Sequence, residues 1–198
     1  MHKSRRFRCI AFLLVALFVA ACAPAKPAFK GTDISGVEWG GDFELTAHTG
    51  QRVKASDAKG KVLLLFFGYT HCPDICAPTL ARLASLMQQL GPEAERVQVL
   101  FVTVDPRHDT VEQLAGFVPK FHPAFIGLTG TAREIGRVAQ DYKVAYAENP
   151  QSASSQILVD HSGGMLVKDA TGKLRLLFRN DMSVNDMAHD VRRLLKGG

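Results

Sequence analysis

Two stretches of nearly continuous apolar residues predict the centre of a β-sheet. Residues 62–67 hold six apolar residues in a row, and residues 97–104 hold a second such stretch. Runs of this kind are typical of strands that helices cover on both faces. Behind each run, apolar residues recur at three- and four-residue steps, in residues 80–90 and 111–118. This spacing places them on one face of a helix, so the sequence predicts two strand–helix units.

Shorter patterns predict the rest of a single domain. The expected elements are an N-terminal β-hairpin at 43–54, a short strand at 125–128, a helix at 131–142, a loop of polar residues at 147–156, a strand at 157–159, a hairpin at 165–178 and a final helix after Ser183. The expected helix caps are Asp109 or Thr110, Thr131 with Glu134 in a capping box, and Ser183. Strands interleaved with helices indicate an α/β fold, with a central mixed sheet, helices on both faces and an added N-terminal β-hairpin.

The composition fits one globular domain and argues against a nucleic-acid-binding protein. The 198 residues are 46% hydrophobic and 22% charged, which is enough apolar material for one core. Four of the basic residues behind the net charge of +5 lie in the first 21 positions, where no acidic residue occurs. Without that segment the charge is +1, so the basic excess belongs to a leader and not to a nucleic-acid-binding surface.

Residues 1–21 resemble a bacterial lipoprotein signal peptide. A basic start is followed by an apolar run that is short for a membrane span, and small residues precede Cys22. This pattern predicts that Cys22 becomes the lipid-modified first residue of the mature chain. An uncleaved signal anchor and an ordinary signal peptide cut nearby are the alternatives. We expect residues 22–32 to form a flexible membrane tether and residues 33–198 to form the folded domain. We expect an exported, lipid-anchored protein at the periplasmic face of a bacterial membrane, with the inner or outer membrane left open.

Export leaves Cys72 and Cys76 as the thiols of the mature domain, because Cys9 leaves with the leader and Cys22 carries lipid. They lie four residues apart where the first apolar strand gives way to a helix, which is the arrangement of thioredoxin-like folds. At the first turn of a helix, unpaired N–H groups favour thiolate over thiol. Two such sulfur atoms suit a Cu(I) ion, a redox-active pair or, in an oxidising compartment, a structural disulfide.

His161 is the candidate third ligand of a metal site. It follows the apolar strand at 157–159, which places it at a strand end or in a loop. In a thioredoxin-like topology the strand that opens the late hairpin runs beside the active-site turn, and an imidazole there would complete a site for Cu(II) as well as Cu(I). A surface histidine, or a buried one with its hydrogen bonds satisfied, explains the same residue. Met87 belongs to an apolar helix face and is expected to fill the core rather than to bind copper.

Three ordered blocks of the sequence resemble the Sco/SenC family of copper chaperones. The first block, residues 68–76, contains both cysteines; the second is residues 102–110 and the third is residues 159–162. The similarity extends from about residue 33 to the C-terminus. The sequence departs from the family pattern at one place, because Ala77 follows the second cysteine where the family usually has proline.

This resemblance implies a thioredoxin-like fold in which Cys72, Cys76 and His161 bind one copper ion per chain, as Cu(I) or Cu(II). It further implies a membrane-tethered chaperone that hands copper to the dinuclear copper site of cytochrome c oxidase, or reduces the cysteines of that site. The expected partner is the copper-site subunit of that oxidase, or another exported copper or thiol protein. Asp105 and Asp160, in the second and third blocks, are candidates for contacting the ligands rather than the metal, and a capping or turn role accounts for them equally well.

Two other functions use the same cysteines. The first is that of an enzyme, a thiol–disulfide oxidoreductase or peroxidase, with Cys72 and Cys76 as its redox-active pair. Redox motifs of the thioredoxin type usually have two residues between the cysteines, whereas this chain has three, and a peroxidase of the peroxiredoxin kind normally has Thr or Ser where Tyr69 stands. The second is a structural disulfide in an exported binding domain. We therefore interpret the chain as a metal-binding chaperone, with thiol–disulfide reductase activity as the alternative.

Overall fold

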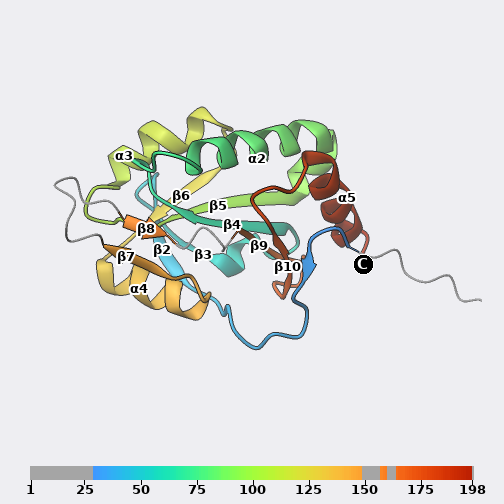
Figure 1. The fold of residues 1–198 in the computed structure, drawn as a ribbon, viewed down its shortest axis with the longest axis horizontal. Helices are drawn as coiled ribbons and strands as arrows, with labels where there is room; N and C mark the ends of the chain where they lie inside the picture. The colour runs from blue at the N-terminus through green and yellow to red at the C-terminus, as the bar shows by residue number, and fades with distance from the viewer. Residues whose placement is uncertain (1–28, 149–156, 160–163, 198) are drawn as a thin grey trace, which may run out of the picture.

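An eight-stranded mixed sheet forms the centre of the computed structural model, which describes residues 29–148, 157–159 and 164–197 (Figure 1). The strand order is β1-β10-β9-β4-β5-β6-β2-β3. The strands are β1 (Thr32–Asp33), β2 (Glu44–Ala47), β3 (Arg52–Lys54), β4 (Val62–Gly68), β5 (Val97–Thr103), β6 (Ile126–Thr129), β9 (Met165–Lys168) and β10 (Leu174–Phe178). The helices are α2 (Cys76–Leu90), α3 (Val111–Phe117), α4 (Ala132–Asp141) and α5 (Val184–Leu195), with short 3-10 helices η1 (Ala55–Ala58), η2 (Gly91–Arg96) and η3 (Val118–Lys120). The predicted α/β class with a central mixed sheet is confirmed.

β4 and β5 run parallel at the centre of the sheet, and their apolar sequences explain that position. All seven residues of β4 are buried, and Phe66 lies opposite Phe101 of β5. β9 pairs with the other side of β4 in the antiparallel direction, with Leu166 opposite Leu65. A strand that has neighbours on both sides and helices on both faces exposes no side chain, which is why β4 lacks the alternating pattern of a surface strand.

Helices cover both faces of this sheet, as the helical spacing predicted (Figure 1). On one face, Leu83 of α2 and Val191 of α5 join a buried cluster with Val99 of β5. On the other face, Ile135 of α4 joins a second cluster with Leu65 of β4. Among the described residues, every helix is too short or too polar to span a bilayer.

The predicted helix caps are present, and the structure decides between the two candidates for α3. The hydroxyls of Thr131 and Ser183 each accept a hydrogen bond from the backbone N–H three residues further on, at the starts of α4 and α5. Thr110 caps α3 by accepting a hydrogen bond from the backbone N–H of Gln113. Asp109 does not act as this cap, because its buried carboxylate instead accepts hydrogen bonds from Thr70 and from Thr103 at the end of β5.

Both predicted hairpins form, and the N-terminal one extends the main sheet. β2 pairs with β3 on one side and with β6 on the other, so this hairpin is one edge of the eight-stranded sheet. β7 (Tyr146–Glu148) and β8 (Ile157–Val159) pair with each other in a separate two-stranded sheet. β8 confirms the strand predicted at 157–159. The prediction of a loop from residue 147 is wrong for residues 147 and 148, which belong to β7; residues 149–156 lie outside the described residues.

The folded part of the chain begins before residue 33, where the domain boundary was predicted. The backbone N–H groups of Lys30 and Gly31 donate to the buried carboxylate of Asp190 in α5, at 2.7–3.0 Å. Two N–H donors, one of them shared between both oxygens of a single buried carboxylate, fix the backbone at this point. Residues 29–32 are therefore part of the domain rather than of a flexible tether. The expected signal peptide lies outside the described residues.

Candidate metal centre

The two cysteines lie in the turn that joins the end of β4 to the start of α2. β4 ends at Gly68, whose carbonyl accepts a hydrogen bond from the Val104 N–H at 2.9 Å, and this contact holds the ends of β4 and β5 together. α2 begins at Cys76, and its N-cap residue Ile75 provides no side-chain hydrogen bond to the helix. Because the first N–H groups of a helix have no partner within it, those at this helix start are available to a sulfur atom.

The two thiols are free, and they differ in exposure and acidity. Cys76 is 2% exposed, whereas Cys72 is partly exposed. Burial alone would raise the pKa of Cys72, but hydrogen bonds from the Cys76 thiol and from the N–H groups of Asp74, Ile75 and Cys76 outweigh burial and lower the pKa. Burial, together with the hydrogen bond to Cys72, raises the pKa of Cys76 far above the ordinary thiol value. The arrangement favours a thiolate at Cys72 beside a protonated thiol at Cys76.

Gly68 leaves room for the buried sulfur atom. A Cβ added at this position would lie 2.7 Å from Sγ of Cys76 and 3.0 Å from Cε2 of Phe101. Both distances are shorter than the ordinary contact of about 3.5–4.0 Å between non-bonded heavy atoms. The last residue of β4 therefore has to be glycine for Cys76 to occupy this position.

Asp109, which the sequence suggested only as a helix cap, ties the cysteine turn to the end of β5. Its carboxylate accepts hydrogen bonds from the backbone N–H of Thr70 at 3.0 Å and from the Thr70 hydroxyl at 2.5 Å. The hydroxyl of Thr103, the last residue of β5, donates to it at 2.6 Å. Three donors compensate the burial of this charge. Sequence reasoning missed this role because Thr70 lies 39 residues earlier, and a carboxylate behind a buried strand was the only signal.

Asp105 and Tyr69 lie at the same corner of the sheet. The Asp105 carboxylate contacts Nδ1 of His108 at 2.8 Å, and the Asp105 backbone N–H donates to the Thr103 hydroxyl at 2.9 Å. Burial raises the pKa of Tyr69, and the negative charges of the Cys72 thiolate and of Asp105 raise that pKa further. The Tyr69 phenol therefore lies within electrostatic range of the cysteine pair, and sequence reasoning had not assigned this residue to the site.

The other expected site residues lie outside the described residues. These residues are His161, Asp160 and the lipidation residue Cys22. In the part of the chain that the structure describes, no group of three or more His, Cys, Asp or Glu side chains is arranged to hold a metal ion. The described site supplies two sulfur ligands, a set that suits a two-coordinate Cu(I) ion. That Cys72, Cys76 and His161 bind a metal ion stays a prediction.

Comparisons with known proteins agree on one relationship. A family model described as SCO1/SenC matches residues 32–196. The mitochondrial SCO2 homolog of Bos taurus is 39% identical over 155 residues, which cover 77% of this chain and 58% of that protein. The SCO2-like protein of Rickettsia felis is 34% identical over 184 residues, which cover 91% of this chain and 88% of that protein. The chain thus spans less than two thirds of the mitochondrial relative and most of the bacterial one.

A solved structure shows the same fold. The structure of Bradyrhizobium japonicum ScoI with copper bound is similar to this chain with a TM-score of 0.72 and 32% sequence identity. The match covers 79% of this chain and 99% of that chain. This likeness confirms the thioredoxin-like fold that the di-cysteine turn and the order of elements predicted.

Proposed function

The chain belongs to the SCO1/SenC family, and on this basis we propose that it is a copper metallochaperone. It binds one copper ion, as Cu(I) or Cu(II), through Cys72, Cys76 and His161, and delivers this ion to the dinuclear copper site of cytochrome c oxidase. The Sco family is one of cytochrome c oxidase assembly proteins, and a relative at 32% identity holds copper. Both facts support the proposal.

The observation that carries the proposal is the pair of free thiols at the start of α2. Thiolate sulfur is the ligand that Cu(I) prefers among protein side chains. Cys72 is partly exposed and its pKa is lowered, so its thiolate is ready to capture an incoming ion. Cys76 is buried with a raised pKa, and its proton leaves when the metal binds. On delivery, a ligand of the partner approaches the copper ion from the side of the accessible sulfur.

The same geometry supports a second candidate function, reduction of a disulfide in a partner protein. The Cys72 thiolate attacks one sulfur of the partner's disulfide and forms a mixed disulfide, and the other partner sulfur leaves as a thiolate. The Cys76 thiol then loses its proton and attacks Cys72, which releases a fully reduced partner and leaves a Cys72–Cys76 disulfide. The observation in favour is the difference between the two thiols, one accessible and acidic, the other buried.

We propose, further, that the protein is exported and acts at the periplasmic face of a bacterial membrane, anchored by a lipid on Cys22. Its partner is the copper-site subunit of cytochrome c oxidase, or another exported copper or thiol protein. The basic and apolar leader, followed by small residues before Cys22, supports this location.

Copper titration of the full chain and of single-residue variants tests the chaperone function. We expect one Cu(I) per reduced wild-type chain in competition with a chromogenic chelator, and an intense Cu(II)–thiolate absorption. Cys72→Ala and Cys76→Ala should abolish both signals. His161→Ala should weaken binding by at least the roughly 10- to 100-fold that loss of an outer contact of a metal site costs.

A matched histidine variant serves as the control. His122 lies in the turn after η3, where its Nδ1 accepts a hydrogen bond from the backbone N–H of Ala124, and His122→Ala should bind copper as the wild type does. Unchanged affinity and absorption in His161→Ala would refute the three-ligand site. Catalytic reduction of a disulfide substrate by the copper-free protein, with no copper bound at micromolar concentration, would favour the second candidate function.

A further inference from the structure

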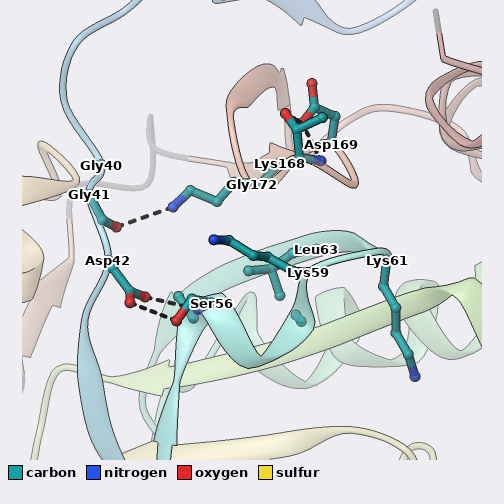
Figure 2. Close-up of a pocket in the computed structure, with 13 residues that line it drawn as sticks. Gly40, Gly41, Asp42, Ser56, Lys59, Lys61, Leu63, Lys168, Asp169 and Gly172 are labelled. Carbon is teal, nitrogen blue, oxygen red and sulfur yellow. Dashed lines mark hydrogen bonds between the residues drawn. The ribbon is translucent and has the colours of Figure 1, made fainter.

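A pocket of about 210 Å³ lies at the end of β4 opposite to the cysteine turn. Leu63, near the start of β4, lines it, whereas the turn follows the other end of this seven-residue strand, about 20 Å away. Its walls come from the segment before β2, from η1 and the residues after it, and from the turn between β9 and β10 (Figure 2). Among the described residues that line it, neither Cys72 nor Cys76 takes part.

Lys168, the last residue of β9, places a buried amino group against this pocket. The residue is 5% exposed and lies opposite Leu63 of β4 and Leu174 of β10, a position in which an apolar side chain is expected. Its Nζ donates to the Tyr142 hydroxyl at 2.7 Å and to the Gly41 carbonyl at 3.2 Å. An ammonium group has three N–H donors, and two of them are used within the described part of the chain, which leaves one for an acceptor in the pocket.

No carboxylate among the described residues forms an ion pair with Lys168. Asp42 and Asp169 line the same pocket, but their oxygen atoms already have donors. Asp42 accepts hydrogen bonds from the backbone N–H and the hydroxyl of Ser56, at 2.9 and 2.7 Å. Asp169 accepts hydrogen bonds from Thr171 and from the Arg175 guanidinium.

Burial of the charged amino group has a cost that its two hydrogen bonds and the charge of Asp42 offset only in part. A buried charge is stable in a protein when an opposite charge or a metal pairs with it. Burial lowers the pKa of Lys168, and the charge of Asp42 opposes that effect only in part. The pocket therefore holds a buried amino group that has no carboxylate in ion-pair contact among the described residues, although the charge of Asp42 acts on it without such contact.

Lys59 adds a second cation to the pocket. Figure 2 shows its side chain reaching into the same space as Lys168, whereas Lys61 points away. Lys59 is exposed, so it contributes an accessible charge at the mouth of the pocket, while Lys168 contributes a desolvated one inside. Charge-assisted hydrogen bonds from a buried ammonium are among the stronger hydrogen bonds in proteins.

We propose that this pocket binds a small oxyanion, a phosphate or a carboxylate, between Lys168 and Lys59. The volume of about 210 Å³ accommodates such an ion with several waters, since a water occupies about 30 Å³ in the liquid. The bound ion connects the segment before β2, η1 and the β9–β10 turn, which lie far apart in the sequence. It therefore stabilises the native state by an amount that grows with the logarithm of its concentration once that concentration exceeds the dissociation constant.

The test is binding of inorganic phosphate, and separately of acetate, to the full chain at constant ionic strength, followed by calorimetry and by the thermal midpoint. Lys168→Met keeps the length of the side chain and removes the charge, and Lys59→Met does the same at the mouth. Lys120→Met, in η3, is the matched control because that lysine is exposed and lies outside the pocket. We expect saturable binding to wild type and control, weakened about tenfold or more in Lys168→Met, and by a smaller factor in Lys59→Met.

Phosphate stabilises many proteins without binding, because it is excluded from their surfaces. An equal rise of the thermal midpoint in all four proteins, or no saturable heat of binding with either anion, would overturn the proposal. If Lys168→Met does not fold, Lys59→Met decides alone: binding equal to the control overturns the proposal, and weaker binding supports it. Saturation by phosphate but not acetate identifies a phosphate site, and the reverse a carboxylate site. Copper binding is measured separately and has no bearing on either outcome.

Discussion

Replacing Gly68 by alanine should disturb the candidate metal centre, although no proposed ligand is replaced. The new Cβ would lie 2.7 Å from Sγ of Cys76 and 3.0 Å from the ring of Phe101. Restoring an ordinary contact of about 3.5 Å requires the sulfur to move by roughly 0.8 Å. Because Phe101 is fully buried in the sheet, its ring can move little, and we expect Cys76 and the start of α2 to move instead.

The size of the displacement sets the expected effects. Overpacking a core by one methyl group typically costs about 1–3 kcal/mol of unfolding free energy. Metal–ligand distances tolerate deviations of only about 0.2 Å, so a shift of roughly 0.8 Å should lower copper affinity by at least about tenfold. Stability and affinity should therefore fall together, although both sulfur ligands are still present.

Denaturant unfolding and Cu(I) competition titration measure the two quantities on the same protein. Gly116→Ala is the matched control, because a Cβ at Gly116 in α3 has no atom within 4 Å. The control should keep wild-type copper affinity and gain up to about 1 kcal/mol of stability, since glycine is unfavourable inside a helix. If Gly68→Ala bound copper as tightly as wild type and lost no stability, the close packing of Gly68 against Cys76 would be refuted.

Three further predictions concern the cysteine pair and two buried carboxylates. Iodoacetamide should modify Cys72 well before Cys76, at a rate that rises with pH through a pKa below the ordinary thiol value, because the thiolate is the reacting form; peptide mass spectrometry reads out the order, and equal rates would contradict the assigned asymmetry. Asp109→Asn should lower the unfolding free energy by about 1–3 kcal/mol in denaturant unfolding, because an amide cannot accept all three of the present hydrogen bonds. A loss of less than about 0.5 kcal/mol would show that the hydrogen bonds of Asp109 to Thr70 and Thr103 contribute little to stability. Asp190→Asn should lower the unfolding free energy by a similar amount, because it releases the segment before β1. The control Asp181→Asn, at an exposed position, should stay within about 0.5 kcal/mol of wild type. Similar stabilities for these two variants would contradict the contact between that segment and Asp190.

The features that sequence predicted well depend on short stretches of chain. A run of apolar residues identifies β4, and a hydroxyl before a helix identifies the caps at Thr131 and Ser183, because each signal lies within a few residues. The cysteine turn was likewise found from its place between a strand and a helix. The position of His161 after a strand made it a candidate, but the prediction that it is a metal ligand depends mainly on the resemblance to a family.

The features that sequence missed depend on contacts between distant residues. Asp109 contacts Thr70, 39 residues earlier, so nothing near it in the chain distinguished a residue that holds the cysteine turn from a helix cap. Lys168 contacts Gly41, 127 residues earlier, and as the last residue of a predicted hairpin strand it gave no sign of being buried. Such roles follow from strand order and register, which local patterns do not determine.

The hydrogen bonds of Asp109 to Thr70 also limit which residues can move when the state of the cysteine pair changes. Thr70 is held to the sheet by two hydrogen bonds, and Cys76 is fixed at the start of α2. For the proposed dithiol, disulfide and copper-loaded forms, we therefore expect the structural change to fall mainly on the short segment between these two fixed points. His71, Pro73 and Asp74 are the exposed side chains of that segment. If the protein is the proposed copper carrier, we expect a partner that distinguishes its copper-loaded form from its copper-free form to contact these three residues, and replacing them should weaken that distinction while leaving the fold intact.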